Sequence, residues 1–302
     1  MTGPAVTELG IFVQLVVSGL AVGAIYALVA LGFVLIFKAT GVLNFAQGDL
    51  MMVGVYVCYL LVVTLGIPFL PALGAALAAA AALGCLVNVT LLRPMVGQPI
   101  FSVVMLTIGL SSVLRSLVGL AAGHQERRFP SPVADAPVAL GPAVISRLGL
   151  WTLGAALLCL AGFLLFFRYT RVGLGMRATA QDQDAAALMG IGVGRVFALS
   201  WAVSAAVATV AGVFLAGITF VHPDMGFVGI RVFPALILGG IDSVAGAIVG
   251  GLLVGVIENL AGGYLDRLVG GGVKELTAFT VILAVLMLRP YGLFGTRDVE
   301  RV

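Results

Sequence analysis

The sequence predicts an all-α polytopic membrane protein, a bundle of roughly 8 to 10 transmembrane helices with broken or re-entrant segments. Its composition is the first observation behind this prediction. Hydrophobic residues make up 61% of the 302 positions and charged residues only 10%, whereas a soluble domain carries roughly 25% charged residues. The second observation is that long apolar runs follow one another along the chain, separated by short polar stretches. Runs of about 18 residues or more are long enough to cross a bilayer as a helix.

The apolar runs give the expected spans in chain order. They are residues 11–37, 48–65, 69–92, 99–121, 150–167, 196–220, 231–260 and 276–289. Two runs are too long for one simple crossing, because about 20 residues suffice for a span. Run 11–37 contains three glycines, and run 231–260 is interrupted by the pair Gly239-Gly240. We expect each of these two runs to be a broken helix or a helical pair.

The first apolar run is also longer than the roughly 7–15-residue core of a signal peptide, so we expect it to be retained membrane structure. No soluble domain interrupts the pattern, and residues 1–302 are expected to form a single transmembrane domain. The composition therefore implies a lipid bilayer as the main surroundings of the chain.

Cationic side chains predict the orientation of the bundle. The stretch 168–195 carries Arg168, Arg171, Arg177 and Arg195, and the C-terminal tail carries further arginines. By the positive-inside rule, both regions face the cytoplasm. Lys38 and Arg93 share that side if the intervening spans alternate, and Arg127, Arg128 and Arg147 lie outside. The side of the N-terminus stays open, because it depends on whether run 11–37 crosses once or twice.

Several kinds of chemistry are missing from the sequence. Neither lysine, Lys38 nor Lys274, follows a glycine, so the phosphate-binding pattern G-x-x-x-x-G-K-S/T is absent. The two histidines, His124 and His222, fall in expected loops, and no H-E-x-x-H or G-x-S-x-G pattern occurs. No basic cluster is dense enough for nucleic acid. We therefore expect no enzyme activity, no cofactor, no metal site and no nucleic-acid partner.

The first concentration of polar side chains at membrane depth is the stretch Asn44-Phe-Ala-Gln47-Gly48-Asp49. Polar groups at that depth are expensive and are therefore candidates for function. In one interpretation the stretch is a re-entrant turn or broken helix beside a solute path. In the other, Asn44 caps a helix and Asp49 is stabilised by the helix dipole. The spacing alone leaves both interpretations open.

Two further charged residues interrupt the apolar runs. Glu258, followed by Asn259, comes late in run 231–260, where it is either the interfacial edge of a helix or a pathway residue. Arg115 lies within run 99–121 and is expected to extend its charged end to the membrane surface. Small residues four positions apart suggest close helix contacts. These pairs are Gly19 and Gly23, Gly246 and Gly250, and Gly251 and Gly255.

The stretch from Arg177 to Gly190 predicts a short cytoplasmic helix. Its Ala, Gln, Leu and Met residues favour helix, and Gly190 is a suitable C-terminal stop. Because membrane spans hold both ends of this helix, it is suited to docking a partner. The alternative is an interfacial helix that lies on lipid headgroups.

Taken together, these stretches resemble the permeases of branched-chain amino-acid ABC importers, specifically the LivH-like family. The resemblance runs over nearly the whole chain. Four pieces carry it, in the order of the family: residues 23–32 with 41–49, residues 177–194, residues 238–251 and the tail 289–295.

The resemblance implies a division of labour among several chains. Such a permease pairs with a second, related permease in a bacterial inner membrane, and two cytoplasmic ATPases drive the pair. A periplasmic solute-binding protein delivers the solute. The stretch 168–195 then resembles the coupling loop of ABC importers, whose pattern is E-A-A-x-x-x-G. The matching positions are Asp184, Ala185, Ala186 and Gly190, with Arg177 nearby.

The resemblance also makes Asn44, Gln47, Gly48, Asp49 and Glu258 candidates to line or gate the solute path. The chain departs from the family in having aspartate instead of glutamate at position 184. Similar permeases serve branched-chain or other hydrophobic amino acids, urea and short amides, and the resemblance does not choose among them. A different alternative is a self-sufficient secondary transporter or channel driven through Asp49 and Glu258.

Overall fold

The computed structural model describes residues 8–140, 143–269, 271–289 and 291–295. In that part of the chain, seven helices are long and apolar enough to cross a membrane. An eighth, shorter apolar helix covers Leu276–Leu288 within α12. The polytopic, helical fold class is therefore confirmed, and each expected span coincides with a helical region. The helices that contain these eight segments are α1 Glu8–Thr40, α2 Gln47–Tyr59, α3 Phe69–Val87, α4 Ile100–Ala122, α5 Arg147–Tyr169, α8 Val193–Ile218, α11 Val244–Val269 and α12 Val273–Leu288.

Two spans continue through π-helical turns. The turn Leu60–Thr64 extends α2, and the turn Asn88–Leu92 extends α3 before a 3₁₀ turn at Arg93–Met95. Outside the helices, β1 (Pro137–Leu140) and β2 (Ala143–Ser146) pair as a small antiparallel hairpin. Two short helices, α6 (Arg171–Gln181) and α7 (Gln183–Leu188), connect α5 to α8.

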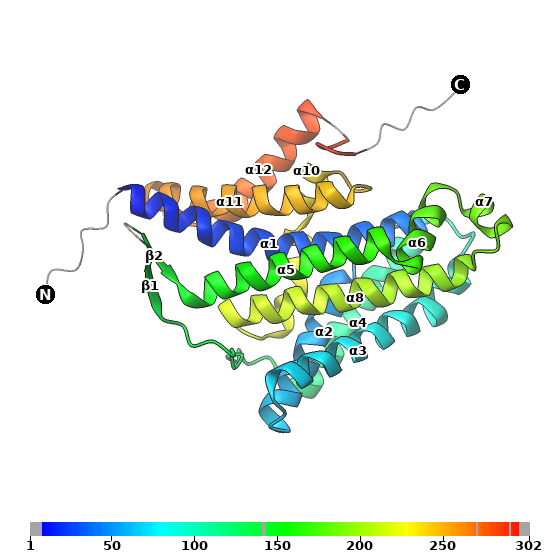
Figure 1. Cartoon of the computed structure of the whole chain (residues 1–302), viewed down its shortest axis with the longest axis horizontal. Helices are drawn as coiled ribbons and strands as arrows, with labels where there is room; N and C mark the ends of the chain where they lie inside the picture. Colours follow the sequence, from blue (N-terminus) through cyan, green and yellow to red (C-terminus); the bar gives the residue numbers. More distant parts are fainter. Residues whose placement is uncertain (1–7, 141–142, 270, 290, 296–302) are drawn as a thin grey trace, which may run out of the picture.

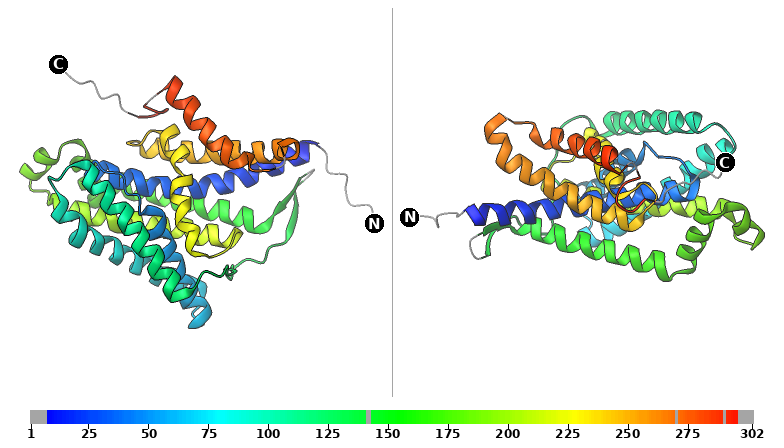
Figure 2. Two further views of the ribbon diagram at one scale, coloured as in Figure 1. Left: turned by 180° about the vertical axis from the view of Figure 1, so that it is seen from behind. Right: turned by 90° about the horizontal axis from the view of Figure 1, so that it is seen from above.

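Helix α1 is one unbroken helix in the middle of the bundle, between α5 and α11 (Figures 1 and 2). The prediction that run 11–37 is broken or a helical pair is wrong. Glycine in a helix keeps its backbone hydrogen bonds, and here the missing side chains let another helix approach. A Cβ added to Gly23 would lie 2.8 Å from the carbonyl oxygen of Gly251 in α11. A Cβ on Gly255 would overlap Gly23 in the same way, so the predicted glycine contacts are confirmed.

Run 231–260 is broken, as the sequence predicts. It forms α9 (Val228–Arg231), α10 (Phe233–Gly239) and then α11. The chain turns at Gly240, whose φ of +105° is a conformation that L side chains rarely adopt. The break leaves carbonyl groups at the end of α10 without partners from the next turn. The amides of Leu293 and Phe294 supply partners by donating to the carbonyls of Leu238 and Gly239, at 2.8 and 3.0 Å.

Helix α2 begins inside the bundle rather than at its end. Its first residue, Gln47, lies against Gly32 of α1, where an added Cβ would overlap the Gln47 amide. Gly32 lies about 12 Å along the helix axis from Thr40, at the end of α1. The short stretch 41–46 therefore turns back into the bundle after α1 has left it. This turn back into the bundle agrees with one part of the interpretation as a re-entrant turn or broken helix, and the adjoining solute path stays a prediction.

The cationic residues divide between the two ends of the bundle as the sequence predicts. The Gln183 side chain of α7 donates to the carbonyl of Ala39, next to Lys38, at 3.2 Å. We call this the α7 end. At the other end, the start of α1 lies beside the β1–β2 hairpin (Figure 1). Arg147 begins α5 there, and Arg127 pairs with Val221 through backbone hydrogen bonds. We call this the hairpin end.

Candidate solute pathway and coupling site

The start of α2 is held by a network of uncharged polar groups. The Oε1 atom of Gln47 accepts a hydrogen bond from Asn44 Nδ2 at 3.2 Å, and it lies 3.0 Å from the Ser204 hydroxyl of α8. The same hydroxyl lies 2.8 Å from the carbonyl oxygen of Gly32. Asn44, Gln47 and Ser204 are all buried. The network therefore joins α1, α2 and α8 at the depth where α2 begins.

Asn44 is not the residue that caps α2. Ala46 occupies the cap position, and its side chain makes no capping hydrogen bond. Asn44 Oδ1 instead accepts a hydrogen bond from the backbone amide of Ala46 at 3.0 Å. Asn44 thus forms a local turn two residues earlier, a usual role for asparagine. The next amide, of Phe45, donates to the Thr107 hydroxyl of α4 at 3.2 Å. The prediction that Asn44 caps α2 is therefore wrong, whereas Asp49 does lie in the first turn of a helix, as the capping interpretation expects. Side-chain hydrogen bonds tie the stretch to its neighbours.

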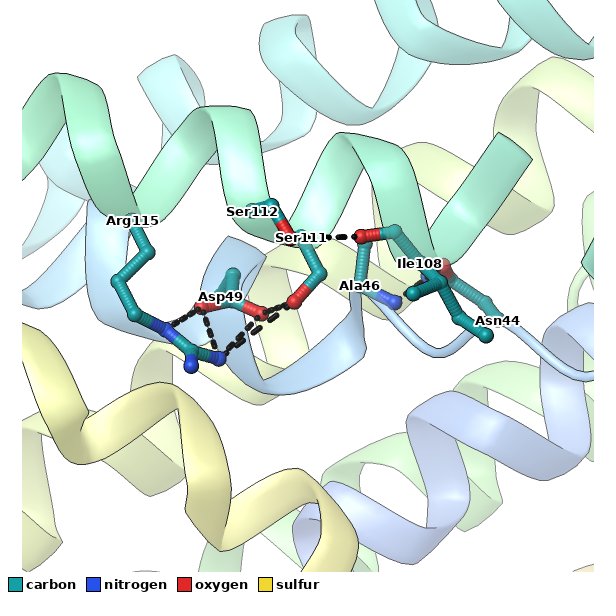
Figure 3. A network of polar contacts seen from close by, with 7 residues as sticks. All are labelled: Asn44, Ala46, Asp49, Ile108, Ser111, Ser112 and Arg115. Carbon is teal, nitrogen blue, oxygen red and sulfur yellow. Dashed lines mark hydrogen bonds and ion pairs between the residues drawn. The ribbon is translucent and has the colours of Figure 1, made fainter. Parts of the chain in front are cut away.

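Asp49 lies in the first turn of α2, two residues after Gln47, where it meets Arg115 (Figure 3). Arg115 Nε and Nη2 each donate to Asp49 Oδ1 at 3.1 Å, and the Ser111 hydroxyl donates to Oδ2. Asp49 is 1% exposed and the Arg115 side chain 24% exposed. The expectation that Arg115 reaches the membrane surface is wrong. A buried carboxylate in an apolar bundle requires a cation, and Arg115 is the cationic residue of α4.

A backbone segment covers this ion pair from the other side. The 3₁₀ segment Pro223–Phe227 packs on α2, where an added Cβ on Gly48 would overlap the carbonyl oxygen of Gly226. The ring of Phe227 lies under the Arg115 guanidinium, 3.8 Å from the guanidinium carbon to the ring centroid. This distance is within the range for a cation–π contact. Gly48 is therefore needed for close approach, and the ion pair is enclosed by α2, α4 and the 3₁₀ segment.

Glu258 lies in a different part of the bundle from Asp49. The Tyr26 hydroxyl of α1 donates to Glu258 Oε2 at 3.0 Å, and Glu258 is 6% exposed. Because α11 continues to Val269, Glu258 is inside the helix and not at its interfacial edge. The neighbouring Asn259 side chain donates to the Gly255 carbonyl within the helix. Glu258 borders a cavity of about 400 Å³ towards the hairpin end.

The predicted coupling helix is two short helices at the α7 end. The Thr170 hydroxyl accepts from the amide of Gly173 to cap α6. The Asp182 carboxylate accepts from the amide of Ala185, at 2.8 Å, to cap α7. The expectation of one continuous helix over 177–190 is therefore wrong, because Asp182 separates α6 from α7 and caps the start of α7. Gly190, with a φ of +82°, ends it as predicted.

The coupling candidates differ in exposure. Ala186 is buried, whereas Asp184, Ala185 and Gly190 are exposed. Arg177 donates to the carbonyl of Arg168 at 3.0 Å and holds the start of this connection together. Leu188 and Met189 are 89% and 84% exposed, so α7 presents an uncovered tip. A surface of this kind is available for contact with another chain.

A second cavity, of about 220 Å³, links the coupling region to the re-entrant stretch. Gln183 of α7 and Asn44 both line it, together with Asn88, Arg93 and Trp201. The cavity lies at the α7 end of the bundle. A movement of α7 therefore has a short structural route to Asn44, through the Gln183–Ala39 hydrogen bond and the loop that follows Ala39.

Comparison with known proteins agrees with this architecture. Residues 15–289 match the family described as "Branched-chain amino acid transport system / permease component". The chain is 33% identical to the high-affinity branched-chain amino acid transport system permease protein LivH of Salmonella typhimurium, over 96% of this chain and 98% of that protein. It is 32% identical to the permease protein BraD of Pseudomonas aeruginosa, with the same coverage.

More distant similarities were also found. A probable branched-chain amino acid transport permease protein LivH of Methanocaldococcus jannaschii is 30% identical over 89% of this chain and 88% of that protein. Among solved structures, PsaBC from Streptococcus pneumoniae in complex with Fab is similar with a TM-score of 0.48 and 16% identity. That similarity covers 94% of this chain and 92% of the other. The family match and the full-length relatives establish that this chain belongs to the permease family of branched-chain amino acid ABC transport systems.

Proposed function

We propose that this chain is the membrane-spanning permease subunit of an ATP-driven importer for branched-chain or related hydrophobic amino acids. It works as a heterodimer with a second, related permease in a bacterial inner membrane. Two cytoplasmic ATPase chains hydrolyse ATP, and a periplasmic binding protein delivers the solute. The α7 end and the C-terminus face the cytoplasm, in accordance with the positive-inside rule.

The observation that carries this proposal is the match of residues 15–289 to the branched-chain amino acid transport permease family. A hydrogen bond between Gln183 and Ala39, 3.2 Å long, suggests how motion enters this chain. It connects the exposed helix α7 to the last turn of the central helix α1. ATP binding closes the two ATPases, which push on α7 through the surface that includes Asp184 and Ala185. The motion passes to Ala39 and from there to the loop that ends at Asn44.

The loop is a suitable receiver of this motion. Its hydrogen bonds at Asn44 and Gln47 are between uncharged groups, which exchange partners at lower cost than a buried ion pair. The Asp49–Arg115 pair lies behind them and fixes α2 against α4. In this proposal, Asn44 and Gln47 gate the pathway, while Gly48 and Asp49 hold the gate in position.

The same geometry argues against the secondary-transporter alternative. A residue that carries a coupling ion must be able to release its counter-charge during the cycle. Asp49 instead accepts three contacts from Arg115 and one from Ser111. These contacts favour a structural role for Asp49 over that of an ion carrier.

Substrate choice follows from the family and not from the polar gate. A pathway must release its cargo, so it binds weakly, and specificity rests mostly with the binding protein. We therefore assign branched-chain or related hydrophobic amino acids as the cargo. Urea and short amides are the alternative cargo.

Uptake competition tests the proposal. The genes beside this one are expected to encode two ATPases, a second permease and a binding protein. Cells that express the complete set are expected to take up labelled leucine, with competition by valine and phenylalanine but little by glutamate or urea. Competition by urea as strong as that by valine would contradict the cargo assignment. An absence of ATPase genes and of any ATPase requirement would contradict the importer.

A further inference from the structure

Arg115 leaves part of its hydrogen-bonding capacity unused within this chain. Its Nε and Nη2 atoms contact Asp49, and Nη2 also lies 3.5 Å from the Ser111 hydroxyl. The third guanidinium nitrogen, Nη1, makes no hydrogen bond or ion pair with the residues that the structure describes (Figure 3). A guanidinium group has five N–H donors, and the two on Nη1 still need an acceptor.

These two N–H groups lie at the depth of the membrane spans. On the hairpin side of the ion pair, α4 continues for about 10 Å past Arg115, and α2 with its π-helical turn continues for about 22 Å past Asp49. Because Asp49 holds the guanidinium, it does not extend to the lipid headgroups. Lipid acyl chains offer no hydrogen-bond acceptor, so an unsatisfied cation at this depth is costly.

The guanidinium also reaches the outer surface of the bundle. The Arg115 side chain is 24% exposed, whereas the Asp49 side chain is 1% exposed. Phe227, whose ring lies under the guanidinium, is 46% exposed. The surface of this chain therefore presents a cationic group at this point, and something other than lipid must cover it.

Small residues occupy the exposed side of α4 next to Arg115. Gly109, Ser112 and Ser116 are exposed, and their spacing of three and four positions places them on one side of the helix. A Cβ added to Gly109 would meet nothing within 4 Å, so no other described element packs there. Glycine lets helices approach closely in a membrane, and serine forms hydrogen bonds between them. This side of α4 is therefore suited to a helix of another chain.

We propose that the second permease packs against this side of α4 and that one of its oxygen atoms accepts hydrogen bonds from Arg115 Nη1. The contact surface, which we call the α4 face, comprises Gly109, Ser112, Arg115, Ser116 and Phe227. The identity of the partner rests on the proposed function. The need for a polar partner rests on the guanidinium alone.

Arg115 also selects a partner that differs from this chain. In a dimer of two copies, a two-fold axis along the membrane normal would place two α4 faces opposite each other at the same depth. Two guanidinium groups would then meet, and like charges opposite each other disfavour association. A related chain with a carboxylate or amide oxygen at this place pairs with Arg115 instead. The α4 face therefore favours a heterodimer over a dimer of identical chains.

Photo-crosslinking in native membranes tests the contact in the complete transporter. A photo-crosslinking amino acid replaces Ser116, or Gly154 as the control, because Gly154 is exposed on α5 and a Cβ there meets nothing within 4 Å. Position 116 is expected to give a covalent product with the second permease, and position 154 none. Products with a second copy of this chain, or with lipid alone, would overturn the proposal. Labelling of Ser116→Cys by a water-soluble maleimide, without a crosslink from position 116, would indicate an aqueous space and would also overturn it.

Matched substitutions measure the strength of the contact. Gly109→Leu places a large side chain on the α4 face, and Gly154→Leu makes the same change on α5. Energy transfer between labelled permeases in liposomes reports their association. It is expected to show association weakened about tenfold or more in Gly109→Leu and unchanged in Gly154→Leu. Two differently labelled copies of this chain are expected to show no energy transfer between them.

A lysine at position 115 separates the two roles of the arginine. Arg115→Lys keeps a cation for Asp49 but lacks the planar fork that serves two partners at once. The association of this variant with the second permease is expected to weaken about tenfold. Thermal unfolding of the variant by itself shows whether it is folded.

The outcomes separate this inference from the proposed function. Wild-type association in Gly109→Leu, or in a folded Arg115→Lys variant, would overturn the α4 face. The importer would still stand in that case if ATP-driven uptake required both permeases. Uptake by this chain and the ATPases without the second permease would instead overturn the proposed function.

Discussion

Arg115 and Asp49 form an ion pair inside the helix bundle although they are 66 positions apart in the sequence. Two guanidinium nitrogens lie 3.1 Å from one carboxylate oxygen, and Phe227 closes the site from the other face. The pair connects α2 to α4 beside the point where the chain re-enters the bundle. It therefore fixes the position of the helix that carries the proposed gate.

The effects of substitutions at Asp49 and Arg115 on the stability of the protein are expected to be coupled. Asp49→Asn alone leaves a cation facing a buried site, which costs up to about 3 kcal/mol, less to the extent that Arg115 is exposed. Arg115→Gln alone leaves a buried carboxylate and is expected to cost more. The double variant is expected to be more stable than the sum of the two changes predicts, as measured by thermal unfolding in detergent. Strict additivity would show that the two side chains do not stabilise each other.

Gly48 is expected to tolerate no side chain. A methyl group there would overlap the carbonyl oxygen of Gly226, so Gly48→Ala must push the 3₁₀ segment away from α2. Overpacking of this kind costs about 1–3 kcal/mol and is expected to lower both thermal stability and uptake. Gly74→Ala in α3, where an added Cβ meets nothing within 4 Å, is the matched control. Equal behaviour of the two variants would refute the close contact.

Gln183 is expected to transmit the movement of α7 to α1. Gln183→Ala removes the hydrogen bond to Ala39 and leaves the exposed surface around Asp184 in place. We expect the ATPases to remain bound and to hydrolyse ATP. Leucine uptake per ATP is expected to fall by up to about tenfold, because one hydrogen bond contributes about 1 kcal/mol. Gln181→Ala, an exposed neighbour, is the control. Wild-type uptake per ATP in Gln183→Ala would exclude this route.

Asp184 is expected to act at an earlier step, in docking itself. Asp184→Lys reverses the charge of an exposed side chain on α7 and is expected to abolish uptake or ATPase association while the protein still reaches the membrane. Co-purification of the ATPases with the permease measures the association. Normal uptake and normal co-purification would refute the docking role of α7.

Asn44 is expected to affect the pathway and not solute capture. Asn44→Ala removes the hydrogen bonds to the amide of residue 46 and to Gln47, which loosens the start of α2. Uptake by the complete transporter is expected to change, while the affinity of the separate binding protein for leucine stays constant. Unchanged uptake would return Asn44 to the role of a local turn former.

The sequence predicts the spans well because hydropathy alone decides which segments enter a membrane. It predicts the break at Gly240 correctly and a break in α1 incorrectly, although both runs contain glycines. The difference is tertiary. Gly19 and Gly23 of α1 face α11 and allow close helix contact, whereas Gly240 adopts a φ of +105° that turns the chain. Sequence spacing does not distinguish these two uses of glycine.

The sequence predicts the candidate site only in part. The stretch 44–49 is conspicuous because three polar side chains interrupt apolar runs, but its partners Arg115, Ser111 and Ser204 come from distant helices. A charge balance within the spans is the signal that could have found Arg115. Asp49 needs a cation, and Arg115 is the single cationic residue of α4. Ser111 lies on the same side of α4, four positions before Arg115. The sequence does not predict the division of the coupling region at Asp182, because an aspartate that caps a helix and one inside a helix are the same residue type.

The most direct test of the account is uptake of labelled leucine into liposomes that contain this permease, its second permease and both ATPases. The binding protein and leucine are supplied on the delivery side and ATP on the other. We predict uptake that requires ATP and the binding protein and that is lost in Asp184→Lys. Leucine transport by this chain alone, driven by an ion gradient without ATP, would contradict the account.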